Sequence, residues 1–120
     1  MVASRLELSL VALGPLAAAA TCPASISSMC VVFAETEIVG LLASGASSQD
    51  IIAGVQAAVA KRIAAMAGRN VEGPIAFTGG VAMISGMAAA LETALGQPIT
   101  VVPTPQMTGA LGAAILASRD

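Results

Sequence analysis

The sequence places a pair of glycines at the end of a short apolar run, a pattern found in ligand-binding backbone loops and in tight packing turns. Residues 75–82 read Ile-Ala-Phe-Thr-Gly-Gly-Val-Ala, a short apolar run that ends at Gly79 and Gly80 and is followed by helical spacing. Glycine lets a backbone approach a ligand where a Cβ atom would clash, and a following helix offers free N–H groups to an anion. A tight packing turn uses the same pattern, so the glycine pair alone leaves both interpretations open.

A second glycine-containing segment follows a short distance downstream. Residues 105–114 read Pro-Gln-Met-Thr-Gly-Ala-Leu-Gly-Ala-Ala, which is typical of a helix with very small side chains. Gly109 and Gly112 are three residues apart and therefore lie on one face of that helix. We expect another helix to pack very closely against this face.

The chain has no histidine to act as a metal ligand or general base, so Cys22 and Cys30 are the side chains to consider for a soft metal ion. Cys22 and Cys30 do not form a Cys-x-x-Cys pair, so their spacing does not indicate a metal site. A cysteine in an alanine-rich interior is most often a small buried hydrophobic residue. We interpret Cys22 as structural, and from spacing alone Cys30 receives the same interpretation.

The composition excludes several classes of protein. Hydrophobic residues make up 57% of the 120 residues, charged residues 10% and aromatic residues 2%, with five basic and seven acidic side chains. A disordered chain has the opposite balance, and nucleic-acid binding requires a cationic surface or aromatic stacking platforms that this chain lacks. The long uncharged stretches are interrupted by prolines, serines and glycines, so we expect no membrane-spanning helix. The length fits one small domain.

The spacing of apolar residues predicts a mostly helical α/β chain with two short strands. In one helix, Ile51, Val55, Ala58, Val59, Ile63 and Met66 form an apolar stripe, with Ser48 as N-cap and Gly68 at the end. The expected helices are 5–20, with a break at Gly14-Pro15, then 33–43, 48–66, 81–95 and 106–118. The expected strands are 74–78 and 99–102.

The order helix–strand–helix–strand–helix predicts a crossover unit with two parallel strands. Parallel sheets are buried on both faces and usually have more than two strands. An unpaired apolar strand edge pairs readily with another chain. We therefore expect this chain to associate, with the face around Gly109 and Gly112 in the buried surface.

Three blocks together resemble one protein family. Residues 27–37 read Ser-Ser-Met-Cys-Val-Val-Phe-Ala-Glu-Thr-Glu, residues 77–82 read Phe-Thr-Gly-Gly-Val-Ala, and Pro-Gln at 105–106 precedes Gly-Ala-Leu-Gly-Ala-Ala at 109–114. In this order they are similar to the ATP-dependent activators of 2-hydroxyacyl-CoA dehydratases and the related ATPase subunits of benzoyl-CoA reductase. The resemblance runs through nearly the whole chain.

The resemblance implies a partial ribonuclease-H-like lobe of the actin-like ATPase superfamily, mostly helical with two parallel strands. Such proteins bind ATP or ADP with Mg²⁺ between two lobes. They pair with a second copy or a homologous subunit and share a four-iron, four-sulfur cluster across the dimer. ATP hydrolysis drives a low-potential electron into a dehydratase or reductase partner. We expect a cytoplasmic protein, because a cluster enzyme of this kind works away from oxidising compartments.

The same resemblance assigns roles to individual residues. Cys30 stands at the position of a cluster ligand, and thiolate ligation suits an iron–sulfur site. The residues expected near the nucleotide are Thr78, Gly79, Gly80, Val81 and Gln106. Glu35 and Glu37 are expected to point to different sides of their helix and to make favourable contacts in its first turn.

The chain also departs from the family pattern. It lacks an earlier Cys-Ala-x-Gly-Thr-Gly block with a second cluster ligand, and it lacks the amino-terminal phosphate loop with its acidic residue. Residues 1–120 are therefore interpreted as a carboxy-terminal piece of an actin-like ATPase domain, whether a truncated form, a split gene or a misassigned start codon. Two alternatives stay open, a lobe of a sugar or acetate kinase of the same superfamily and a non-catalytic fragment. The sequence does not identify the acyl-CoA acceptor.

Overall fold

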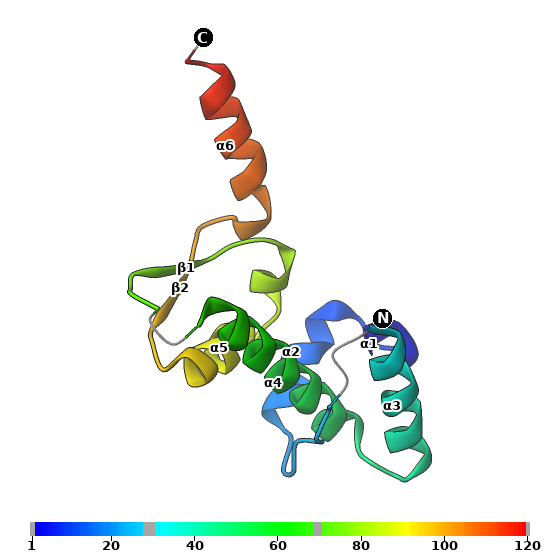
Figure 1. The fold of residues 1–120 in the computed structure, drawn as a ribbon. Coiled ribbons are helices and arrows are strands. Elements are labelled where there is room, and N and C mark those ends of the chain that lie inside the picture. The colour runs from blue at the N-terminus through cyan, green and yellow to red at the C-terminus, as the bar shows by residue number, and fades with distance from the viewer. Residues whose placement is uncertain (1, 28–30, 69–70, 120) are drawn as a thin grey trace.

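The computed structural model describes residues 2–27, 31–68 and 71–119. In these residues the long helix α4 runs through the middle of the molecule, and α6 extends away from the rest (Figure 1). The elements in chain order are α1 (Val2–Arg5), α2 (Leu10–Ala18), α3 (Val31–Ala43), α4 (Ser48–Ala67), β1 (Ile75–Phe77), the 3-10 turn η1 (Gly80–Met83), α5 (Met87–Leu95), β2 (Ile99–Val101), the 3-10 turn η2 (Pro105–Met107) and α6 (Thr108–Ala117).

Helix α4 has defined signals at both ends. Ser47 is the N-cap, and its side chain accepts a hydrogen bond from the Asp50 amide at 3.1 Å. The prediction of Ser48 as N-cap was wrong by one residue, because Ser47 has the extended backbone that a cap requires and Ser48 is already helical. Gly68 ends the helix with a positive φ of 82°, as predicted.

No helix in the described part of the chain is long and apolar enough to cross a membrane.

The predicted apolar stripe of α4 is only partly the buried face. Ile51 is fully buried, but Val59, Ile63 and Met66 are exposed by 39%, 37% and 79%. The reason is that α2 and α5 pack against α4 from directions that the helical pattern does not encode. The residues of α4 that are buried are Ile51, Ile52, Gly54, Gln56 and Ala60.

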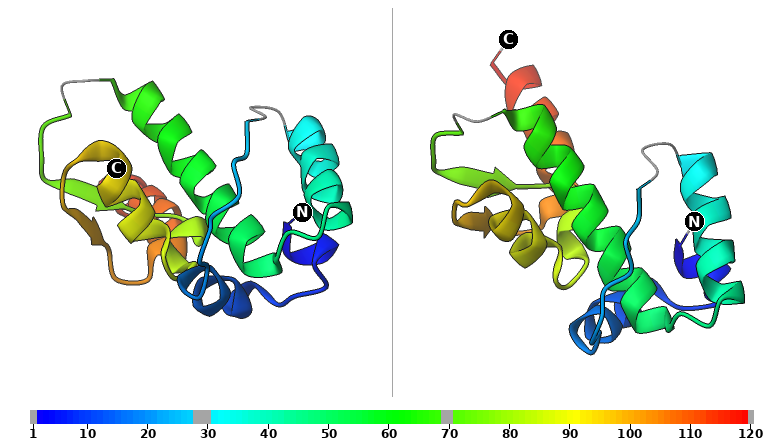
Figure 2. Two further views of the ribbon diagram at one scale, coloured as in Figure 1. Left: turned by 90° about the horizontal axis from the view of Figure 1, so that it is seen from below. Right: turned by 60° about the horizontal axis from the view of Figure 1, so that its bottom comes forward.

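The two expected strands form a parallel pair. Ile75 pairs with Ile99 and Phe77 with Val101. Helix α5 lies between the strands in the sequence and packs beside β2, and the Ile99 amide donates to the Glu92 carboxylate of α5 at 2.9 Å. Figure 2 shows the pair and α5 on one side of α4, with α3 on the other. The prediction of two parallel strands joined by a helix is confirmed.

The predicted helix 81–95 is divided in two. Residues Gly80–Met83 form a 3-10 turn, and α5 begins only at Met87. Gly86, between them, has a φ of 89°, a left-handed conformation that interrupts a right-handed helix. The helical spacing of the sequence continues through this interruption, which is why the spacing alone did not locate it.

The predicted break at Gly14-Pro15 was also wrong. Pro15 lies inside α2, and the chain is interrupted earlier, between α1 and α2, where Glu7 has a φ of 55°. Gly14 serves a different purpose, since a Cβ atom there would lie 2.2 Å from the Ser85 Cβ. This glycine therefore permits α2 to approach the segment that precedes α5.

Helix α6 has no buried residue and points away from the other elements (Figure 1). A Cβ atom built at Gly109 or Gly112 would meet no atom within 4 Å. The predicted close helix packing at these glycines is therefore not made within the described part of the chain. The exposed side chains of α6 include Leu111 and Leu116.

Candidate functional site

The five residues expected near a nucleotide lie on two neighbouring loops. Residues 78–81 follow β1, and Gln106 follows β2. Because the strands are parallel, both loops follow the carboxyl ends of the strands at the same end of the sheet. We call this end of the sheet, with residues 78–81 and Gln106, the glycine edge. The Gly79 amide donates to the Pro105 carbonyl oxygen at 2.8 Å, which joins one loop to the other. The structure thus brings together residues that are more than 20 positions apart in the sequence.

Gly79 and Gly80 differ in backbone conformation. Gly79 has a φ of 89°, a conformation that other residues rarely adopt. Gly80 has no positive φ, and a Cβ atom built on either glycine would meet nothing within 4 Å. The backbone at the glycine pair therefore faces open space that another molecule can approach.

The chemistry of this edge comes from neutral groups. Thr78 and Gln106 are exposed, Val81 is 48% exposed, and residues 71–118 contain no lysine, arginine or histidine. Gly80 begins a four-residue 3-10 turn, so the prediction of a helix directly after the glycines was wrong. Backbone amides, a hydroxyl and a carboxamide can bind a ligand here, but this edge offers no general base.

Cys30, the predicted cluster ligand, lies outside the described residues. Cys22 is described and has an exposed, free thiol. Within residues 2–27, 31–68 and 71–119, no group of three or more histidine, cysteine, aspartate or glutamate side chains is arranged to hold a metal ion. The role of Cys30 stays a prediction.

Asp50 is a positioning residue that the sequence analysis missed. Its carboxylate accepts hydrogen bonds from the amides of Cys22 at 2.8 Å and Thr21 at 3.1 Å, and from the Ser47 hydroxyl at 2.8 Å. These bonds, with that from Cys22 foremost, lower the pKa of Asp50 below its ordinary value of 3.8, against a smaller opposing effect of burial. The Ser-x-x-Asp pattern at 47–50 is the local signal for this capping arrangement.

Two carboxylates hold the loop 21–27 at its two ends. Asp50 binds its start, and Glu37 of α3 accepts hydrogen bonds from the Ser27 amide and hydroxyl, both at 3.0 Å. Glu35, in contrast, forms an ion pair with Arg5 of α1. The prediction that Glu35 and Glu37 point to different sides is confirmed. The prediction that they lie in the first turn of their helix was wrong, because α3 begins at Val31 and its first turn has no acidic residue. In the sequence, the loop 21–27 ends three residues before Cys30.

The comparisons with known proteins first define a class. The activator of 2-hydroxyisocaproyl-CoA dehydratase from Clostridium difficile, solved with bound ADPNP, superimposes with a TM-score of 0.88. The two are 39% identical, and the match covers 96% of this chain and 43% of the activator. The fold is therefore part of an actin-like ATPase lobe, as predicted.

The family model and the similar proteins identify the family of ATPases to which this chain belongs. The model of the BadF/BadG/BcrA/BcrD ATPase family matches residues 1–117, and the chain belongs to this family. The (R)-2-hydroxyglutaryl-CoA dehydratase activating ATPase of Acidaminococcus fermentans is 42% identical over 120 residues, which are 99% of this chain and 46% of that protein. The activator of lactoyl-CoA dehydratase of Anaerotignum propionicum is 46% identical over 99 residues, 82% of this chain and 38% of that protein. The chain thus spans less than half the length of these relatives.

Proposed function

We propose that this chain is the carboxy-terminal part of an ATP-dependent activator that delivers a low-potential electron from a four-iron, four-sulfur cluster to a 2-hydroxyacyl-CoA dehydratase or a benzoyl-CoA reductase. Family membership and relatives named as dehydratase activators support this function. The observation that carries it is the open glycine edge after β1, joined to the loop after β2 through Gly79 and Pro105. No observation favours the alternative of a sugar or acetate kinase lobe.

In this proposal the nucleotide binds at the glycine edge. Thr78, Gly79, Gly80 and Val81 approach it from one loop, and Gln106 approaches it from the other. Open space beyond the Cβ positions of both glycines supports close contact between backbone and ligand. The edge supplies one wall of a binding site, so ADP binding by this chain alone is expected to be weak.

The test is ADP binding to the isotope-labelled protein, followed by NMR because weak binding is still visible in amide shifts. Gly80→Val is the decisive variant, since its backbone has no positive φ and its side chain enters open space. We expect ADP to shift the amides of residues 78–81 and 106 in the parent protein, and Gly80→Val to weaken binding about tenfold or more through steric exclusion.

Gly40→Val is the matched control. Gly40 lies on α3, and a Cβ atom there also meets nothing within 4 Å. This variant should bind ADP as the parent does. Unchanged ADP affinity in a folded Gly80→Val protein would contradict the assignment, as would ADP shifts confined to other parts of the chain. Gly79→Val is less informative, because its φ of 89° would strain a β-branched residue.

We also propose Cys30 as the cluster ligand of this chain, in a cluster shared with a second copy or a homologous subunit. Cys30 immediately precedes α3, which begins at Val31. Anaerobic reconstitution of the full-length dimer with iron and sulfide tests this assignment. Cys30→Ala should lose the bound iron and sulfide and leave ADP binding intact, whereas Cys22→Ala should retain both. A full complement of iron and sulfide in Cys30→Ala would remove Cys30 from the ligand set.

A further inference from the structure

The protein exposes more surface than a folded chain of its size. Its solvent-accessible area is 7729 Å², whereas a folded monomer of 11.7 kDa exposes about 5,900 Å². Its radius of gyration is 16.1 Å, against about 13.6 Å for a compact domain of 120 residues. The excess area is about 1,800 Å², and one partner in an interface of standard size buries about 800 Å². The surface left uncovered is therefore large enough for a stable dimer.

Helix α6 is one part of this uncovered surface. Its residues Thr108–Ala117 include no charged side chain, and Leu111, Ile115 and Leu116 are exposed. Leu111 and Ile115 lie one turn apart and therefore share a face of the helix. Among the described elements, the one that α6 contacts most is η2, at its own start. A helix that is apolar on all sides is normally buried against other elements.

A stiff segment holds α6 out from the rest of the chain (Figure 1). Pro103 and Pro105 flank Thr104, whose φ of 46° is a left-handed conformation that a β-branched residue rarely adopts. The Pro105 carbonyl oxygen also accepts the hydrogen bond from the Gly79 amide, which fixes the base of α6 beside the sheet. An element held out in this way can pack on a second copy of the chain.

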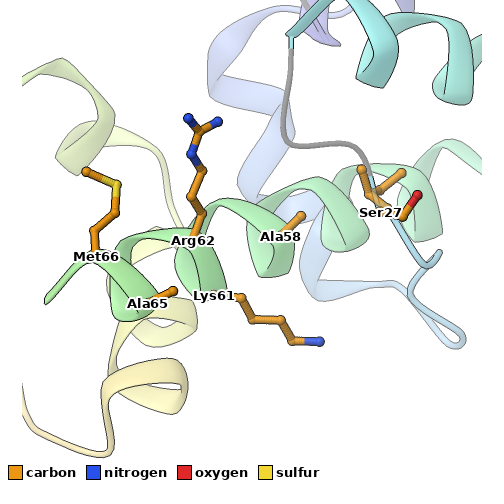
Figure 3. A pocket seen from close by; sticks show the side chains of 7 residues that line it. Ser27, Ala58, Lys61, Arg62, Ala65 and Met66 are labelled. Atoms are coloured by element: carbon orange, nitrogen blue, oxygen red, sulfur yellow. The ribbon is translucent and has the colours of Figure 1, made fainter. Parts of the chain in front are cut away.

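The carboxyl half of α4 offers an apolar face of suitable length. Ile52 is buried, and the same side of the helix continues with Val59, Ile63 and Met66, which are exposed. We call these three residues the exposed α4 face. Figure 3 shows Met66 and Lys61 leaving α4 in different directions, so the charge of Lys61 does not interrupt this face. The face is about 11 Å long and the ten residues of α6 span about 15 Å, so α6 can cover all of it.

We propose that α6 packs on the exposed α4 face of a second copy of this chain, and that the second copy makes the same contact in return. Leu111 and Ile115 of one copy then contact Val59, Ile63 and Met66 of the other. Both surfaces are uncovered in the same molecule, so one association with two-fold symmetry covers α6 and α4 of both copies. The contact joins uncharged side chains, so no charge has to be removed from water to form it. This dimer does not depend on the proposed function.

Sedimentation velocity of the purified chain tests the contact through variants of opposite charge. Leu111→Glu places an acid on α6, and Ile63→Lys places a base on the exposed α4 face. Each dimer contains the contact twice, so weakening one contact about tenfold raises the dissociation constant about a hundredfold. Each variant alone should therefore sediment as a monomer at the low micromolar concentration at which we expect the parent to be a dimer.

An equimolar mixture of the two variants is the decisive sample. In a mixed pair, one contact is unchanged and the other brings the two introduced opposite charges together, so the mixture should regain the dimer. Val11→Glu is the matched control, because Val11 is 86% exposed on α2 and lies outside both surfaces. This variant should dimerise like the parent. Met66→Lys repeats the test at the most exposed position of the α4 face, so a loss of folding in Ile63→Lys does not decide the result.

Three results would overturn the proposal. A monomeric parent would leave both surfaces to a different polypeptide. A folded Ile63→Lys or Met66→Lys protein that dimerises like the parent would show that α6 does not contact the α4 face, as would such behaviour of Leu111→Glu. A mixture that stays monomeric, although each variant is folded, would show that the two surfaces do not meet.

Discussion

Gly54 of α4 provides a sharp test of how the loop 21–27 is fixed. A Cβ atom at this position would lie 2.1 Å from the Ala24 carbonyl oxygen and 3.0 Å from its carbonyl carbon. These are backbone atoms, so a rotamer change cannot relieve the contact. The Ala24 amide also donates to the Asp50 carbonyl oxygen at 2.8 Å, and moving the loop would break this bond.

The magnitude for Gly54→Ala follows from three opposing effects. Overpacking against the loop costs about 1–3 kcal/mol, and loss of the Ala24 hydrogen bond costs about 1 kcal/mol. Replacing glycine by alanine within a helix returns about 1 kcal/mol. We therefore expect Gly54→Ala to lower the free energy of unfolding by about 2 kcal/mol in total.

Urea unfolding followed by circular dichroism measures this difference. At an m-value of about 2 kcal/mol per molar urea, the midpoint should fall by about 1 M. Gly40→Ala on α3 is the control, because a Cβ atom there meets nothing within 4 Å, and it should raise stability by about 0.5–1 kcal/mol. A Gly54→Ala protein as stable as Gly40→Ala would refute the reasoning that the loop lies directly against α4.

Three further predictions concern acid stability, a buried amide and association. Because the folded-state pKa of Asp50 is lowered, its contribution to stability is present above about pH 4 and is lost as the pH falls through the folded pKa. The difference in unfolding free energy between the parent and Asp50→Asn should therefore shrink as the pH is lowered. A difference that stays constant with pH would contradict this. Gln56→Met removes the hydrogen bond from the buried Gln56 to the Ser85 carbonyl oxygen and should cost about 1 kcal/mol in urea unfolding, whereas no loss would argue against that bond. The chain should sediment as an assembly at low micromolar concentration, and Leu116→Glu on the exposed face of α6 should reduce association; a monomeric parent with a cooperative melt would show that two strands suffice.

Local signals in the sequence determined the elements and the candidate site. The strand pair, the helix between its strands, the end of α4 at Gly68 and the end of α5 at residue 95 were all predicted from short-range patterns. The same holds for the two loops that carry Thr78–Val81 and Gln106. A strand, a cap and a glycine turn depend on residues a few positions apart, so the sequence contains the information directly. The family resemblance then predicted that these loops lie near a bound nucleotide.

The tertiary structure alone decided which surfaces meet. The sequence could not show that Gln56 of α4 is buried and Met66 exposed, because burial depends on where α2 and α5 pack. It could not distinguish a helix break at Gly14 from a close contact with Ser85, since a glycine fits both and only the distant neighbour decides. The hydrogen bond from Gly79 to Pro105 likewise joins residues whose proximity is set by the parallel pairing of β1 and β2. Each of these contacts is made between distant parts of the chain, and no local pattern encodes the position of the partner.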